Sequence, residues 1–138
     1  MITIDDRHAP RLVRMNPATF AAAFGEELLA GAEALVEDAQ ASILDGSVSG
    51  SKHVPSAPGE APNNQTGRLH DSGFVGDLIE GDGTVQTFAG FDTPYAGYLE
   101  HGTSKMIERP FLSPATRRQQ LPVFEALLGR FRQIVGLR

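Results

Sequence analysis

Four histidines are the side chains of this sequence best suited to acid–base or metal chemistry at neutral pH. They stand at His8, His53, His70 and His101, and no two of them are three or four residues apart. The two-histidine zinc motif of a helix is therefore missing. We expect His101 to be a capping or interface residue rather than a catalytic base. The sequence contains no Cys, which excludes a thiolate metal site, a Cys nucleophile and a disulfide framework.

A second candidate for chemistry is the run His70-Asp71-Ser72, which has the residue types of a nucleophilic triad. Consecutive residues rarely align nucleophile, base and orienting acid, so we expect this run to cap a turn. The glycines and acids of residues 77–83 match neither a phosphate-binding loop nor a calcium loop. The sequence thus predicts no enzyme, no metal and no cofactor. A small hydrolase that uses His70, Asp71 and His101 is the alternative from another class.

Charge is divided unevenly along the sequence. Residues 16–100 carry 13 acidic and 2 basic side chains, whereas residues 101–138 carry 2 acidic and 7 basic ones, and the net charge is −5. The division indicates either two solvated faces or a head-to-tail contact between copies, acidic patch against basic patch. The basic C-terminal helix could touch nucleic-acid phosphate, but the acidic remainder of the sequence would repel it. Its arginines that could serve an interface are Arg117, Arg118, Arg130 and Arg132.

A long amphipathic helix is predicted over residues 16–46. Asn16 is a good N-cap, Pro17 suits the first helical position, and Gly46 supplies the end. Apolar residues recur at spacings of three and four, as on the buried face of a helix. They are Phe20, Phe24, Leu28, Ala32, Leu35, Ala39 and Ile43.

The elements that follow are shorter. Strands are predicted at 73–78 and 84–91 around a hairpin turn, then a short helix at 95–101 that Gly102 ends, then a third strand at 105–109. A final helix begins at the Ser113-Pro114 cap, and Pro122 should split off its first turn.

Together these elements predict one α+β domain in which a long N-terminal helix and a C-terminal helix pack on a small antiparallel sheet. Its parts are an N-terminal arm (1–15), the long helix (16–46), an extended Pro/Gly-rich loop (47–67), a sheet region with a short helix (68–112) and the C-terminal helix (113–138). No apolar run is long enough to span a bilayer, and the N-terminus lacks a secretory signal. We therefore expect no membrane contact and synthesis in a reducing cytoplasm.

Two blocks in the middle of the sequence carry a recognisable pattern. In the helix block, residues 95–115, Tyr-Ala-x-Tyr-hydrophobic-Glu-x-Gly-Thr leads to Arg-Pro-Phe-hydrophobic-x-Pro-Ala. In the loop block, residues 55–72, a run of Pro, Gly and Glu leads to Thr-Gly-x-Leu. The order and spacing of both blocks resemble the tail-component family of lambdoid-type phages, whose members are tail-completion, neck or minor tail proteins. His101 and Pro122 depart from the family pattern.

The resemblance implies a structural virion protein at the head–tail junction, assembled in the host cytoplasm. It implies a homo-oligomeric ring, expected to be a hexamer, that joins the tail tube to the head connector around a channel for DNA. The implied partners are other neck and tail proteins: the connector or stopper, the tail terminator and the tail tube. A tail-terminator protein that caps the tail tube is the alternative within the same class.

The residues of the helix block also have physical roles. We expect Tyr95, Tyr98 and Leu99 to anchor the short helix on the sheet, and Glu100 and Arg109 could form an ion pair within or between subunits. The interface or fold-defining set is Tyr95, Tyr98, Glu100, His101, Gly102, Thr103, Arg109, Pro110 and Phe111. The loop residues expected to contact neighbouring subunits are Pro55, Pro58, Glu60, Pro62 and Arg68.

Overall fold

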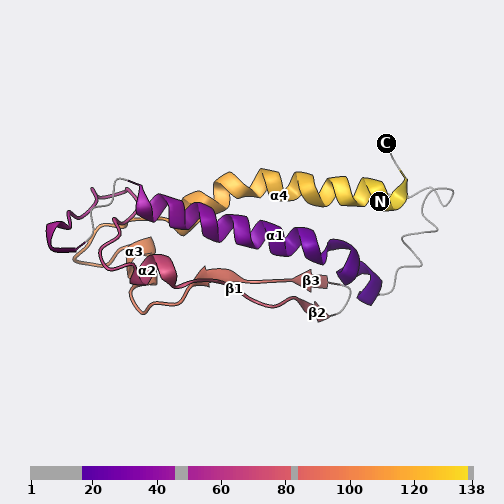
Figure 1. Ribbon diagram of the computed structural model, residues 1–138, viewed down its shortest axis with the longest axis horizontal. Helices are drawn as coiled ribbons and strands as arrows, with labels where there is room; N and C mark the ends of the chain where they lie inside the picture. Colours follow the sequence, from indigo (N-terminus) through magenta and orange to yellow (C-terminus); the bar gives the residue numbers. More distant parts are fainter. Residues whose placement is uncertain (1–16, 46–49, 82–83, 137–138) are drawn as a thin grey trace.

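The computed structural model describes residues 17–45, 50–81 and 84–136 (Figure 1). The predicted N-terminal arm, Asn16 and Gly46 lie outside these residues. The elements are, in order, α1 (Pro17–Leu44), the 3-10 turn η1 (Gly50–Lys52), α2 (Arg68–Asp71), β1 (Gly73–Val75), β2 (Ile79–Gly81), β3 (Thr84–Gln86), β4 (Ala89–Phe91), α3 (Ala96–His101) and α4 (Leu112–Val135). The α+β fold predicted from the sequence is confirmed.

The long helix α1 lies between α4 on one side and the strands on the other (Figure 1). The two long helices run antiparallel: Arg118 near the start of α4 donates to Asp38 near the end of α1. Farther along, Arg130 of α4 lies beside Glu27 of α1. The helices approach closely where Gly31 faces Val123: a Cβ at Gly31 would lie 2.6 Å from a Val123 methyl group.

The predicted apolar stripe of α1 is largely confirmed. Phe24, Ala39 and Ile43 are buried, and the stripe residues between Phe24 and Ala39 are half-buried. Val36, which the stripe omitted, is also buried. It packs over Gly73 of β1, where a Cβ would lie 2.7 Å from the Val36 side chain.

The four strands form one interrupted antiparallel ribbon under α1. β1 pairs with β4, with Phe74 opposite Gly90, and β2 pairs with β3, with Gly81 opposite Thr84. The single strand predicted at 84–91 is therefore broken. At the break Gly76 N donates to Phe88 O at 2.6 Å, and the Thr87 hydroxyl donates to Gly76 O at 2.7 Å. A hydroxyl that takes a backbone acceptor interrupts the regular ladder there.

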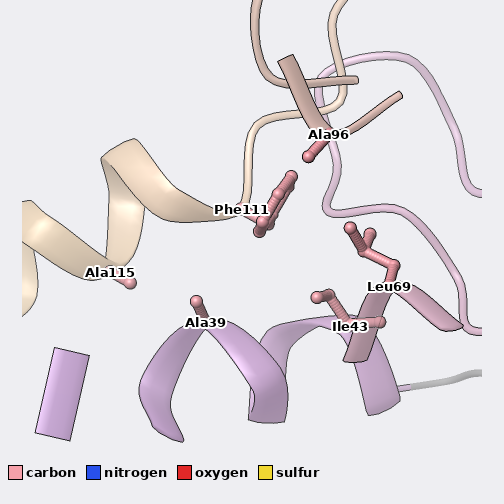
Figure 2. Close-up of a cluster of buried hydrophobic side chains, with 6 residues drawn as sticks. All are labelled: Ala39, Ile43, Leu69, Ala96, Phe111 and Ala115. Atoms are coloured by element: carbon pink, nitrogen blue, oxygen red, sulfur yellow. The ribbon is translucent and has the colours of Figure 1, made fainter. Parts of the chain in front are cut away.

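The core lies where the short helices meet the long ones. Figure 2 shows buried side chains from all four helical segments: Ala39, Ile43, Leu69, Ala96, Phe111 and Ala115. Phe111 is 2% exposed, and its ring meets that of Phe91 edge to face at 5.0 Å. Full burial of a Phe side chain contributes about 1.5–3 kcal/mol, so Phe111 is a main anchor of this end of the molecule.

Two predictions about the C-terminal half are wrong. Lys105–Arg109 is not a strand, because Glu108 O accepts from Gly59 N and Arg109 N donates to Leu99 O, which leaves only an isolated bridge between Thr103 and Met106. Nor does Pro122 split the last helix, since α4 continues through it. Ala115 before the proline is buried, and Val123 after it packs on α1, so both halves are held in line.

Candidate functional site

The two blocks that carry the resemblance meet in space beside the C-terminal end of α1 (Figure 1). Gly59 N of the loop block donates to Glu108 O of the helix block at 2.9 Å. The Arg109 Nε donates to Ser56 O at 3.2 Å. The described part of the loop is thus bonded to its own chain, and this junction is the candidate site. Contact of the loop residues with neighbouring subunits stays a prediction.

Glu100 is the centre of the helix block. Its carboxylate accepts the backbone N–H of Phe111 and of Leu112 at 3.0 Å each and that of Ser113 at 2.8 Å, and it accepts the Ser113 hydroxyl as well. The first N–H groups of a helix have no acceptor within the helix, and a carboxylate there also complements the helix dipole. Glu100 thus caps α4 from α3. The predicted cap, Ser113, is a donor to it.

This environment makes Glu100 a permanent anion at neutral pH. Its side chain is only 9% exposed, and burial by itself raises the pKa of the carboxyl group. The hydrogen bonds from Ser113 and from the three backbone N–H groups outweigh that effect, and the pKa of Glu100 lies below its ordinary value of 4.5. A carboxylate held in this way is a poor proton donor. All its described partners are backbone N–H groups or the hydroxyl group at the start of α4.

Gly102 explains the reversal of the chain after α3. Its φ is +71°, in the region that favours glycine, and a Cβ would lie 2.9 Å from both Glu108 N and Met106 O. Beyond it Thr103 N donates to Met106 O at 2.8 Å, which closes a tight turn. The turn returns the chain to α3, where Arg109 N bonds Leu99 O at 2.7 Å.

The ion pair expected between Glu100 and Arg109 does not form within the chain. Helix α4 uses the carboxylate, and the Arg109 guanidinium bonds Ser56 O, so each charge has another partner. The expected anchoring by Tyr98 is also wrong, because that side chain is 61% exposed. Tyr95 and Leu99 do pack against the core, and Phe111 is part of it.

The remaining predicted residues are spread over the surface around this junction. His101 and Thr103 are exposed, and Pro110 is half-buried between them and Phe111. In the loop block Pro62 is buried. The exposed members are Pro55, Pro58, Glu60 and Arg68.

A cavity of about 340 Å³ opens between the two blocks, and all its lining residues lie within 53–69 and 95–109. Its charged side chains are Arg68, which lies over the Tyr95 ring at 5.9 Å, and Arg109. His53 Nδ1 and the Ser56 hydroxyl are buried there, and neither has a hydrogen-bond partner among the described residues. The lining is cationic and suits an anionic group better than a cation.

Two of the four arginines predicted for a basic face, Arg118 and Arg130, bond to α1 within the chain. Arg118 forms a two-pronged bond to Asp38, and Nε of Arg130 donates to Ala23 O at 2.8 Å and lies 3.7 Å from Glu27. The bond from Arg118 is the main reason why the pKa of Asp38 is lowered. The exposed Arg117 and Arg132 have no ion pair or hydrogen bond to the described part of the chain.

The triad-like run does not have the geometry of a reaction centre. His70 Nδ1 lies 2.7 Å from Asp71, but the Ser72 hydroxyl donates to Leu69 O and not to the histidine. A serine nucleophile needs its base within hydrogen-bond reach. Within 17–45, 50–81 and 84–136, no three His, Cys, Asp or Glu side chains are placed to share a metal ion.

Helix α4 has a second apolar face that the sequence reading missed. Leu121 is 62% exposed, Phe124 59% and Phe131 36%, while Val123 and Ala115 on the other side pack toward α1. The two faces can be traced in the sequence: residues 121, 124, 128 and 131 follow one stripe, and residues 123, 127 and 134 follow another.

Comparisons with known proteins give this chain no relative. No family model matches it, and neither the curated proteins nor the solved structures contain a match. None of the helices in the described ranges is long and apolar enough to cross a membrane. The resemblance of the two blocks to the phage tail-component family therefore remains a hypothesis.

Proposed function

We propose that this chain is a structural, non-enzymatic virion protein of the phage head–tail junction. In this proposal copies of it form a ring, expected to be a hexamer, that joins the tail tube to the head connector. The ring would act with the neighbouring neck and tail proteins. Channel DNA would meet it only through non-specific contacts. The motif residues then serve the fold of the subunit, and its outer surfaces serve assembly.

The observation that carries the proposal is the outer face of α4. Large apolar side chains at Leu121, Phe124 and Phe131 stand exposed along one side of a 24-residue helix whose other side packs on α1. Contiguous apolar surface of this kind is typical of interaction sites. The hydrogen bonds of Glu100 also support a structural role. This buried acid of the helix block is bonded to the start of α4 and holds two helices together.

A gene deletion tests the proposal. In the phage genome that encodes the chain, loss of the gene should leave filled heads and finished tails unjoined in lysates viewed by electron microscopy. Wild-type protein supplied from a plasmid should restore joining, as should Glu108→Gln at an exposed position, whereas Phe124→Ser should not. Normal particles without the gene would contradict the proposal. Tails of uncontrolled length would instead favour the tail-terminator role.

A further inference from the structure

Two stripes of exposed residues run along the long helices on different sides of the molecule. The outer stripe of α4 faces away from α1, and the arginines stand at its two ends. Its spacing of three and four residues keeps it on one helical face. It consists of Arg117, Leu121, Phe124, the half-buried Leu128, Phe131 and Arg132.

The acidic stripe of α1 has the opposite character. Its members are all exposed, and three are small and three acidic: Ala22, Glu26, Ala30, Glu33, Glu37 and Ala41. Glu26, Glu33 and Glu37 have neither a hydrogen bond nor an ion pair with the described residues. The alanines leave room between them for larger side chains from another helix.

We infer that the outer stripe of α4 packs on the acidic stripe of α1 in a second copy of this chain. The large residues Leu121 and Phe124 would lie over the alanines, and Arg117 and Arg132 would reach the glutamates. The lengths agree: fifteen residues separate the two arginines and nineteen separate Ala22 from Ala41, about 22 and 28 Å of helix. The inference rests on the proposed function only in requiring that copies associate.

The contact between α1 and α4 inside one chain is built by the same rule. There Val123 of α4 lies against Gly31 of α1, a large residue over the smallest one. On either side of this close approach an arginine of α4 meets an acid of α1, Arg118 with Asp38 and Arg130 with Glu27. The proposed contact repeats this pairing of a basic, large-residue face with an acidic, small-residue face, between copies.

A symmetric contact of α4 with α4 is disfavoured by charge. An antiparallel pair centred between Phe124 and Glu125 would place Arg117 beside Arg132 of the other copy at both ends. Like charges at an interface are unfavourable. The α4-to-α1 contact uses two different surfaces, so a pair of copies still has one α4 stripe and one α1 stripe free for further copies. Such head-to-tail contacts produce rings or open chains of copies.

Site-specific crosslinking of the full chain tests this contact without background, because the sequence has no Cys. Gln120→Cys, at an exposed residue beside the outer stripe that leaves Leu121 and Phe124 intact, and Ala30→Cys are made separately. A short bismaleimide is added to each variant and to their mixture. The mixture should give a band at twice 14.8 kDa, and neither variant alone should. The double variant should give a ladder of higher multiples. Gln120→Cys mixed with Ala57→Cys, at an exposed loop residue, is the matched control and should remain uncrosslinked.

Three results would overturn the inference. They are a Gln120→Cys dimer without the α1 variant, equal crosslinking with the Ala57→Cys control, and no crosslink in the mixture. Both substituted side chains are exposed, and thermal unfolding of each variant verifies that it folds. The crosslink reports on the contact alone. If heads and tails join without the gene while the mixture still crosslinks, the contact stands and the virion role fails.

Discussion

Glu100 is a buried acid in the helix block, residues 95–115, and a buried carboxylate is a common catalytic group. Its oxygens instead hold the first three N–H groups at the start of α4 and the Ser113 hydroxyl. The bond joins two helices that are separated by a ten-residue connection, 102–111. Glu100 of the helix block is therefore the N-terminal cap that fixes where α4 begins.

Replacement of Glu100 by Gln should destabilise the protein by about 1.5–3 kcal/mol, the range for hydrogen bonds to a charged group. The amide nitrogen of Gln cannot accept the N–H groups that one carboxylate oxygen now accepts. Urea unfolding followed by circular dichroism measures the change. Glu108→Gln, at an exposed acid of the same segment, should change stability little. Equal effects of the two substitutions would contradict the capping role.

The lowered pKa of Glu100 has a definite effect on stability in acid. An acid whose pKa is lower in the folded state contributes stability above its ordinary value of 4.5 and loses it as the pH falls through the lowered pKa. Asp38, with a lowered pKa beside Arg118, acts in the same direction. Unfolding free energies measured from pH 6 to pH 3 should fall for the wild type and fall less for Glu100→Gln. Parallel curves would contradict this account.

Gly102 and Gly97 form a matched pair for testing the turn after α3. Gly102→Ala introduces a Cβ 2.9 Å from two backbone atoms at a φ of +71°, and strain of this kind costs about 1–3 kcal/mol. Gly97→Ala, inside α3 with no atom within 4 Å of the new Cβ, should be neutral or stabilise by up to about 1 kcal/mol. Thermal unfolding distinguishes them. A harmless Gly102→Ala would show that the turn can relax.

At the scale of elements, the close approach of α1 and α4 makes Gly31 a second test. Gly31→Ala gains helix propensity but drives its Cβ to 2.6 Å from Val123, and overpacking costs about 1–3 kcal/mol. Val123→Ala in the same chain should remove that cost, so the double variant should be more stable than the sum of the two changes allows. Gly129→Ala, which meets nothing within 4 Å, should stabilise α4. Additive effects in a urea-unfolding cycle would contradict the close contact.

The elements that the sequence predicted best are those specified by local pattern. The long helix was placed by apolar spacing and by Pro17, and the short helix by the glycine that follows it. The errors lie where a distant group decides the outcome. The cap of α4 comes from Glu100, and Glu108 O is taken by Gly59 in the loop. Neither partner can be identified from the residues next to the site.

The residues of the candidate site could be predicted from the sequence, but the bonds that join its two blocks could not. The sequence singled out both blocks, but it did not show that the two blocks bond to each other. The bonds of Gly59 and Arg109 to the opposite block join residues 49 and 53 positions apart, which no periodicity reveals. Tyr98 was placed on the wrong side because a six-residue helix has too few turns to define a buried face.

For the whole molecule, the uneven charge along the sequence is partly explained by ion pairs between the two long helices. Arg118 and Arg130 neutralise acids of α1 within the chain, so part of the division serves to join the two long helices. The exposed acids of α1 and the exposed Arg117 and Arg132 remain for other contacts. Together with the uncovered apolar residues of α4, they give the subunit two complementary outer surfaces.

The central claim is that this chain is an assembly subunit that associates through the outer face of α4. Native mass spectrometry of the full chain over a range of concentrations tests it most directly. The account predicts a defined multiple of 14.8 kDa for the wild type and a monomer for Phe124→Ser, with Glu108→Gln behaving as the wild type. A wild-type chain that stays monomeric at every concentration, or a Phe124→Ser variant with unchanged assembly, would contradict it.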